Sequence, residues 1–99
     1  MNKITNLCQL AFRAGKLSIG DSLIPSIQSN KAKIVLYATS CGNNRKKKLN
    51  DKCKFYNIPC YELSDDVFLN ISNRSIQSLA ILDKGFAGAI EKEMKGMVI

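Results

Sequence analysis

Histidine is absent from this sequence, and the common signatures of an enzyme are absent as well. There is no G-x-S-x-G nucleophile motif, no Walker glycine loop and no G-x-G-x-x-G after a predicted strand. Cys41 precedes a basic turn that could stabilise its thiolate, but nothing nearby supplies a general base. Asp65 and Asp66 are adjacent acids at the start of a predicted helix, where carboxylates usually complement the helix dipole. We therefore expect no catalysis and no cofactor.

Paired cysteines are also missing. The four cysteines, Cys8, Cys41, Cys53 and Cys60, form no C-x-x-C pair, and without histidine they do not predict a zinc site. An even number would permit two disulfides in a secreted protein. Cys8 and Cys53, however, fall on predicted apolar helix faces, where reduced cysteine behaves as a small hydrophobic residue. The pattern favours free thiols, no bound metal and a cytoplasmic protein.

Long hydrophobic runs are missing too. The longest, at 34–38, is far shorter than a membrane span, and Asn6, Gln9 and Arg13 interrupt the apolar residues at the N-terminus. No membrane anchor or secretion signal is therefore predicted. With 99 residues, of which 45% are hydrophobic, the chain can bury one modest core. We expect a single domain over positions 1–99.

Acidic residues are scarce in the first part of the chain. Positions 1–60 contain 11 Lys and Arg residues against Asp21 and Asp51, which gives nine net positive charges (11 minus 2). Positions 61–99 contain four basic and six acidic residues, or two net negative charges (4 minus 6), and the sum is +7. A field concentrated in this way attracts phosphate backbones. A generally basic protein without a nucleic-acid partner is the alternative.

Apolar residues at helical spacing predict a first helix over 3–14. The second helix contains Pro25, which is comfortable only in a first turn, so this helix begins near Leu23 or Ile24, or its opening turn is irregular. The third helix reaches about Tyr56, the fourth is short and reaches about Ile71, and the final helix is ended by Gly96. The predicted N-caps of these three helices are Asn43 or Asn44, Ser64 and Asp83.

Short apolar runs predict strands at 16–19, 33–39, 60–63 and 78–82. The run at 33–39 is continuously apolar at its centre, which indicates a central strand covered on both faces, and 60–63 is predicted to be a second buried strand. Helices that alternate with such strands imply βα units. The predicted fold class is therefore α/β: a three-layer α/β/α sandwich with a small mixed, largely parallel sheet.

A basic turn at the start of the third helix is the first candidate site. Backbone N–H groups at a helix N-terminus favour phosphate, and cations close by add to the attraction. These cations oppose the helix dipole, and a local conflict of this kind often marks a functional site. A solvated lysine-rich helix is the alternative. The residues predicted to bind RNA here are Asn43, Asn44, Arg45, Lys46, Lys47 and Lys48.

Two further segments are candidates. In 15–22, glycines let a backbone or a base approach closely, although an ordinary strand-to-helix turn with an Asp cap is the alternative. Lys31 lies after the second helix and could extend a basic rim. In 73–77, an arginine could contact phosphate and an isoleucine could pack on an exposed base, unless this is an ordinary surface loop. The residues predicted to bind RNA in these two segments are Lys16, Gly20, Asp21, Ser22, Arg74, Ser75 and Ile76.

Four stretches, taken together and in order, resemble a known family. They are LAFRAGKLSIG (10–20), KAKIVLYA (31–38), NNRKKKLNDKCKFYNIPC (43–60) and LDKGFAGAI (82–90). The chain resembles the kink-turn RNA-binding ribosomal-protein family of the archaeal and eukaryotic large-subunit type, and more narrowly its bacterial YlxQ-like branch. The resemblance covers almost the whole chain. It implies a sandwich whose RNA surface combines the start of the second helix, the turn after the central strand and the loop before the last strand.

The same resemblance implies binding of a sharply bent RNA with tandem sheared G·A pairs. It places Gly20, Asp21 and Ser22 near the family's G-x-N-E stretch, so that Asp21 and Ser22 stand where the family has Asn and Glu. Pro25 stands where the family has a lysine, and the family's acidic turn after the central strand reads Thr-Ser-Cys at 39–41.

Two classes of function follow from the sequence. The first is non-catalytic binding of structured RNA, ribosomal or another non-coding RNA, in ribosome assembly or translation and alongside ribonucleoprotein partners. The second is a protein-binding adaptor or accessory domain of the same fold, in which the lysines would serve solubility. Alanine at Lys46, Lys47 and Lys48 separates the two, because only the first class would lose its ligand.

Overall fold

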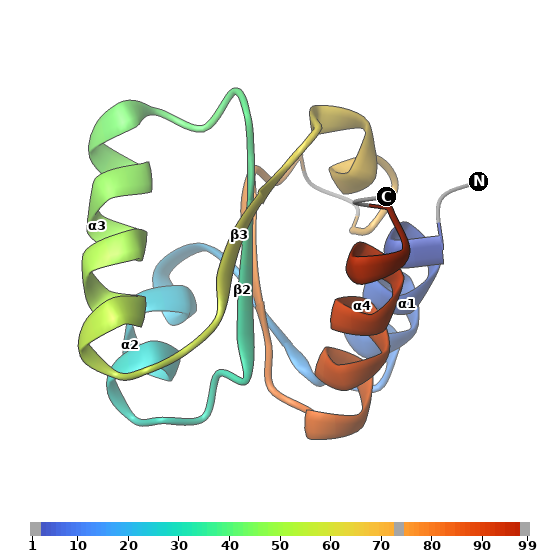
Figure 1. Cartoon of the computed structure of the whole chain (residues 1–99), viewed down its shortest axis with the longest axis horizontal. Helices are drawn as coiled ribbons and strands as arrows, with labels where there is room; N and C mark the ends of the chain where they lie inside the picture. The colour runs from blue at the N-terminus through green and yellow to red at the C-terminus, as the bar shows by residue number, and fades with distance from the viewer. Residues whose placement is uncertain (1–2, 73–74, 98–99) are drawn as a thin grey trace.

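The computed structural model of the protein describes residues 3–72 and 75–97 and has helices on both faces of one sheet (Figure 1). The helices α1 and α4 cover one face, and α2 and α3 cover the other. The predicted α/β/α sandwich is therefore confirmed. In chain order the elements are α1 (Lys3–Arg13), β1 (Leu17–Ser18), the 3-10 helix η1 (Gly20–Ser22), α2 (Leu23–Gln28), β2 (Ile34–Ala38), α3 (Asn43–Phe55), β3 (Cys60–Leu63), the 3-10 helix η2 (Asp65–Phe68), β4 (Ser78–Ile81) and α4 (Lys84–Met97).

The sheet is mixed rather than largely parallel. Its strand order is β1-β4-β2-β3, and only β2 and β3 are parallel neighbours. β4 runs antiparallel to both β1 and β2. The prediction of a largely parallel sheet is wrong because η2 is too short to carry the chain back across the sheet. β4 therefore starts at the end of the sheet where β3 finishes.

The core lies on both faces of β2. Ile34 and Leu36 pack toward α1 and α4, whereas Val35 and Tyr37 pack toward α2 and α3, and all four are buried. The prediction of a central strand covered on both faces is confirmed. β3 is instead an edge strand with an exposed Glu62, so the prediction that it is buried is wrong.

The ends of the helices agree with the sequence in some places and not in others. The helix α2 begins at Leu23, directly after the irregular turn η1. Pro25 therefore lies in the first turn, where the N–H that proline lacks is not needed for a helical hydrogen bond. Asp83 caps α4, because the Phe86 N–H donates to its Oδ2 at 2.9 Å. Ser64 precedes η2 but makes no side-chain cap. The predicted helix to Ile71 is only this short 3-10 segment.

All four cysteines are free thiols, and the side chains of Cys53 and Cys60 interact with each other. The hydrogen bond between the thiols of Cys53 and Cys60 lowers the pKa of Cys53 and raises that of Cys60.

Over the residues that the structure describes, none of the helices combines the length and the apolarity needed to cross a lipid bilayer.

The buried Cys8 predicts a loss of stability at high pH. Desolvation raises the pKa of its thiol from 9.0 to about 12. Below pH 9 both states keep the proton, but between pH 9 and pH 12 the unfolded chain loses it first. The free energy of unfolding should fall there by up to about 1.4 kcal/mol per pH unit from this group. Denaturant titrations at stepped pH should give a shallower fall for Cys8→Ala, and parallel curves for the two proteins would contradict this.

Candidate nucleic-acid interface

Three segments that are far apart in the sequence meet at one end of the sheet. The register pairs Tyr37, near the end of β2, with Ser78 at the start of β4. It also pairs Ser18, the end of β1, with Ala80 of β4. The chain after β1, the chain after β2 and the chain before β4 therefore emerge together. This end carries the start of α3, at the top of Figure 1.

A surface pocket of about 320 Å³ is formed by all three segments. Within it, Arg45 is half-buried, and its Nη2 lies 3.5 Å from the carbonyl oxygen of Gly20, to which it donates a hydrogen bond. Gly20 has a φ of 59°, a left-handed conformation that favours glycine. The three segments that the family resemblance places together are thus neighbours in the fold. The pocket is lined by Gly20, Cys41, Gly42, Arg45, Ser75, Ile76, Gln77 and Ser78.

The turn between β2 and α3 is held by side chains from two other segments. The Ser40 N–H donates to Asp65 Oδ1 at 2.9 Å, and Gln77 Nε2 donates to Ser40 Oγ at 3.2 Å. Sequence reasoning assigned Asp65 to the helix dipole and missed Gln77, because each contact joins residues at least 25 positions apart. Asp65 and Gln77 thus hold the basic turn in position. Neither of them adds a positive charge beside its cations.

The start of α3 differs from the predicted cap. Gly42 is the N-cap residue and makes no side-chain cap hydrogen bond, while Asn43 and Asn44 are the first residues of the helix and are exposed. The prediction that either asparagine caps the helix is therefore wrong. The N–H groups of a first helical turn have no acceptor within their own helix. Their positive ends lie beside the pocket, where an anion would be favoured.

The cations of the basic turn point in different directions. Lys47 and Lys48 are exposed, whereas Lys46 is half-buried and its Nζ lies 3.5 Å from Glu62 Oε2 of β3. Lys46 is thus partly neutralised, and we expect it to contribute less to an anion site than Arg45, Lys47 and Lys48.

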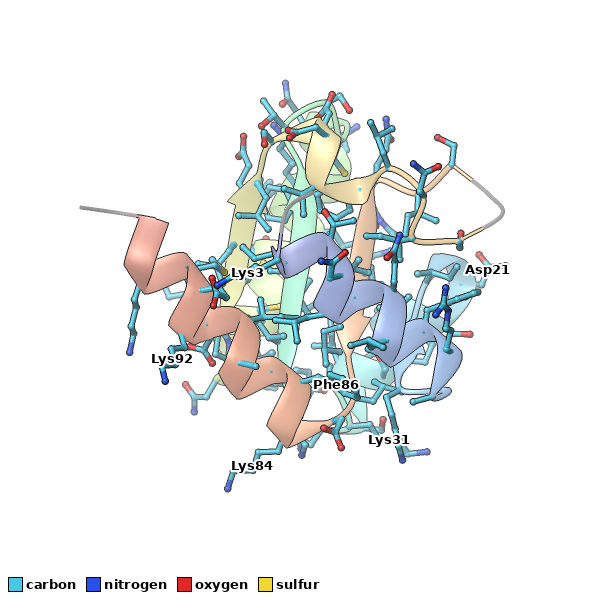
Figure 2. All side chains as sticks on the ribbon, turned by 90° about the vertical axis from the view of Figure 1, so that its right-hand side faces the viewer. Lys3, Asp21, Lys31, Lys84, Phe86 and Lys92 are labelled. Atoms are coloured by element: carbon cyan, nitrogen blue, oxygen red, sulfur yellow. The ribbon has the colours of Figure 1, made fainter. Side chains whose placement is uncertain are left out.

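Two of the predicted residues lie at the opposite end of the sheet. The carbonyl of Lys16 accepts a hydrogen bond from the Leu82 N–H at 2.8 Å, past the end of β4. Lys31 lies before β2, and in Figure 2 it is at the lower edge, well below Asp21. Lys16, predicted from the segment 15–22, and the basic rim expected at Lys31 are therefore not part of this surface.

The remaining predicted residues have mixed positions. Asp21 and Ser22 are exposed on η1 directly after Gly20. Ser75 is exposed and Ile76 is half-buried, and both line the pocket. Arg74 lies outside the described residues.

Two curated proteins are similar to this chain over most of its length. No protein-family model matches the chain. The RNA-binding protein YlxQ of Enterococcus faecium is 40% identical over 96 residues, which cover 95% of this chain and 93% of the relative. The chain belongs to the YlxQ family of RNA-binding proteins. YlxQ of Bacillus subtilis (strain 168) is 33% identical over 87 residues, covering 85% and 87% of the two chains.

Solved structures share the fold of this YlxQ-family chain. A protein of unknown function from Bacillus halodurans C superimposes with a TM-score of 0.88 at 26% identity and covers 96% of this chain and 99% of its own. The Giardia lamblia 15.5kD RNA binding protein gives a TM-score of 0.75 at 15% identity and covers 97% of this chain and 84% of its own. At that identity the similarity shows a shared fold and nothing more. Both curated relatives are named for RNA binding, a non-enzymatic function, so the prediction of a non-enzymatic protein is confirmed.

Proposed function

We propose that this chain binds structured RNA at the end of the sheet where the three segments meet. The observation that carries the proposal is the pocket lined by Gly20, Arg45 and Ile76, one residue from each segment, beside the cationic start of α3. The names of both YlxQ relatives support RNA as the ligand. The proposal treats positions 1–99 as one RNA-binding domain that acts in the cytoplasm.

The chemistry of this surface suits an RNA that is sharply bent. Exposed Lys47 and Lys48, with the first-turn N–H groups of α3, can neutralise phosphates on either side of a bend. The pocket beside them combines polar backbone groups with the apolar Ile76 side chain. Such a surface can bind an unstacked base, whose edge forms hydrogen bonds and whose face packs on apolar groups. A regular duplex cannot offer such a base, because its bases are stacked and paired.

The finer assignment is a kink-turn or a related bent RNA, ribosomal or otherwise non-coding, bound during ribosome assembly or translation. Support comes from the family resemblance and from Gly20, which allows a base edge to approach the backbone of η1. Asp21 and Ser22 follow Gly20 and are exposed, so in this proposal their side chains would contact that edge. Because they replace the family's Asn and Glu, we expect discrimination between kink-turns and other bent RNAs to be modest.

Salt-dependent RNA titrations test this proposal. If roughly four to six phosphates are neutralised, log K should fall with log salt at a slope of about three to five. An RNA hairpin with tandem sheared G·A pairs should bind more tightly than duplex DNA of the same length. The matched control is the same hairpin with the G·A pairs converted to Watson–Crick pairs. Equal and salt-insensitive binding to all three nucleic acids would overturn the proposal.

A further inference from the structure

The last residue of α3 is an unusually exposed aromatic. Of the large hydrophobic residues that the structure describes, Phe55 is the most exposed, at 78%. Its ring centroid lies 4.9 Å from that of Tyr56 with an interplanar angle of 73°, an edge-on contact that braces the Phe55 ring from one side. A lone exposed aromatic would need no explanation. The surroundings of Phe55 are what distinguish it.

Phe55 lines a surface pocket of about 490 Å³ together with cationic side chains. The other lining residues are Lys48, Asp51, Lys52 and Tyr56. Two lysines against one aspartate leave this pocket with a positive charge. Lys48 belongs both to this pocket and to the basic turn, so the two surfaces are continuous.

Helical spacing connects this pocket to the candidate interface. Arg45, Lys48, Lys52 and Phe55 are separated by three, four and three positions, which places them in one stripe along α3. The stripe begins at Arg45 in the pocket beside Gly20 and ends at Phe55. At 1.5 Å per residue it is about 15 Å long. A strand that leaves the first pocket along α3 would thus meet cations before it meets the aromatic ring.

We propose that Phe55 is a stacking platform for an unpaired base of an RNA strand that leaves the candidate interface along this stripe. The inference rests on the proposed function and adds a second, separate contact to it. A cationic groove with an aromatic platform is the arrangement that binds single-stranded nucleic acid, because phosphates pair with the cations and every base has a face that stacks. The ligand class is therefore a single-stranded extension of the structured RNA, with little preference for its sequence.

The test compares hairpins with tandem sheared G·A pairs, with and without a short single-stranded tail at each end, in titrations with the full chain. The wild-type chain should bind the tailed hairpin about 5- to 100-fold more tightly. Phe55→Ala should lose most of this gain, because only the cations still hold the tail, while binding the untailed hairpin as tightly as the wild type. Phe55→Trp should retain the gain, because a larger ring still stacks.

Two controls separate base stacking from other effects. Phe12→Ala removes another exposed aromatic, 41% exposed on α1 on the opposite side of the sheet, and should keep the gain. A tail of abasic nucleotides keeps the phosphates but lacks the bases, and should give the wild-type chain only the smaller part of the gain that comes from the cations. Melting curves of each variant verify that it is folded, so a loss of affinity is a loss of contact.

The outcomes distinguish this inference from the function on which it rests. If the wild type binds both hairpins equally, or if Phe55→Ala keeps the gain, stacking at Phe55 is wrong while structured-RNA binding stands. If neither hairpin binds, the proposed function fails, and a tail oligonucleotide carrying 5-iodouridine decides the base contact. A photocrosslink to Phe55 supports it, and a crosslink elsewhere or none overturns it. Unchanged RNA affinity in Phe55→Ala with loss of a protein partner would likewise overturn it.

Discussion

Replacing Arg45, Lys47 and Lys48 with alanine is expected to weaken binding of a bent RNA hairpin by roughly 30- to 100-fold at low salt. These are the cations of the basic turn that are not paired with an acid within the described residues, and they surround the start of α3. The same variant should reduce the salt slope of log K by about two to three, since about three phosphate contacts are removed. Fluorescence anisotropy over a series of salt concentrations measures both quantities.

The matched control removes three cations from α4. Lys84, Lys92 and Lys95 are exposed on the other side of the sheet, and their alanine variant has the same net charge of +4 (7 minus 3). This control should keep its affinity within about threefold. If both triple variants lose affinity equally, RNA binds to the overall charge and not to the proposed surface. If neither loses affinity, the lysines of α3 serve solubility, as the adaptor hypothesis requires.

Leu36→Ala is expected to lower the free energy of unfolding by about 3 kcal/mol. Leu36 is fully buried in the middle of β2, where it packs with residues of α1 and α4 and is paired with Leu79 of β4. Alanine there removes apolar contacts and leaves a cavity that a strand held on both sides cannot close. Urea denaturation followed by circular dichroism gives the difference directly.

The comparison for this prediction is Leu69→Ala, which deletes the same atoms from a side chain that is 62% exposed. It should change the free energy of unfolding by less than about 0.5 kcal/mol. If the two variants were equally destabilised, the layer between β2 and α1 would not be the main core. A change in the urea dependence with Leu36→Ala alone would instead indicate an altered unfolded state.

Much of the fold could be predicted because its signals are local. The continuous apolar run of β2, the helical spacing of Ile4, Cys8 and Ala11 in α1 and the Asp83 cap of α4 each lie within a few residues. Strand direction is not local in this sense. The direction of β4 depends on whether the preceding segment crosses the sheet, and the short η2 gives a weak signal for that.

The sequence predicted which segments form the candidate site, but it did not predict the residues that hold those segments in position. Gly20, Arg45 and Ile76 were recognisable from their own neighbours in the sequence, and the fold places them around one pocket. The assignment of Lys16 and Lys31 to the same surface failed because charge alone does not say at which end of a strand a lysine will lie. Asp65 could be assigned only to its own helix, because its contact with Ser40 depends on the tertiary fold.

The position of β4 also has a bearing on how the chain is made. β4 is the last strand to be synthesised, yet it lies between β1 and β2, and β1 has no other partner in the described sheet. In a nascent chain that has been synthesised as far as β3, one edge of β2 is unpaired and β1 has no partner strand. Both can pair only after β4, which ends at Ile81, has been synthesised. The three segments around the pocket are brought together by this late insertion. The end of the molecule that carries the candidate interface is thus completed only after most of the polypeptide has been synthesised.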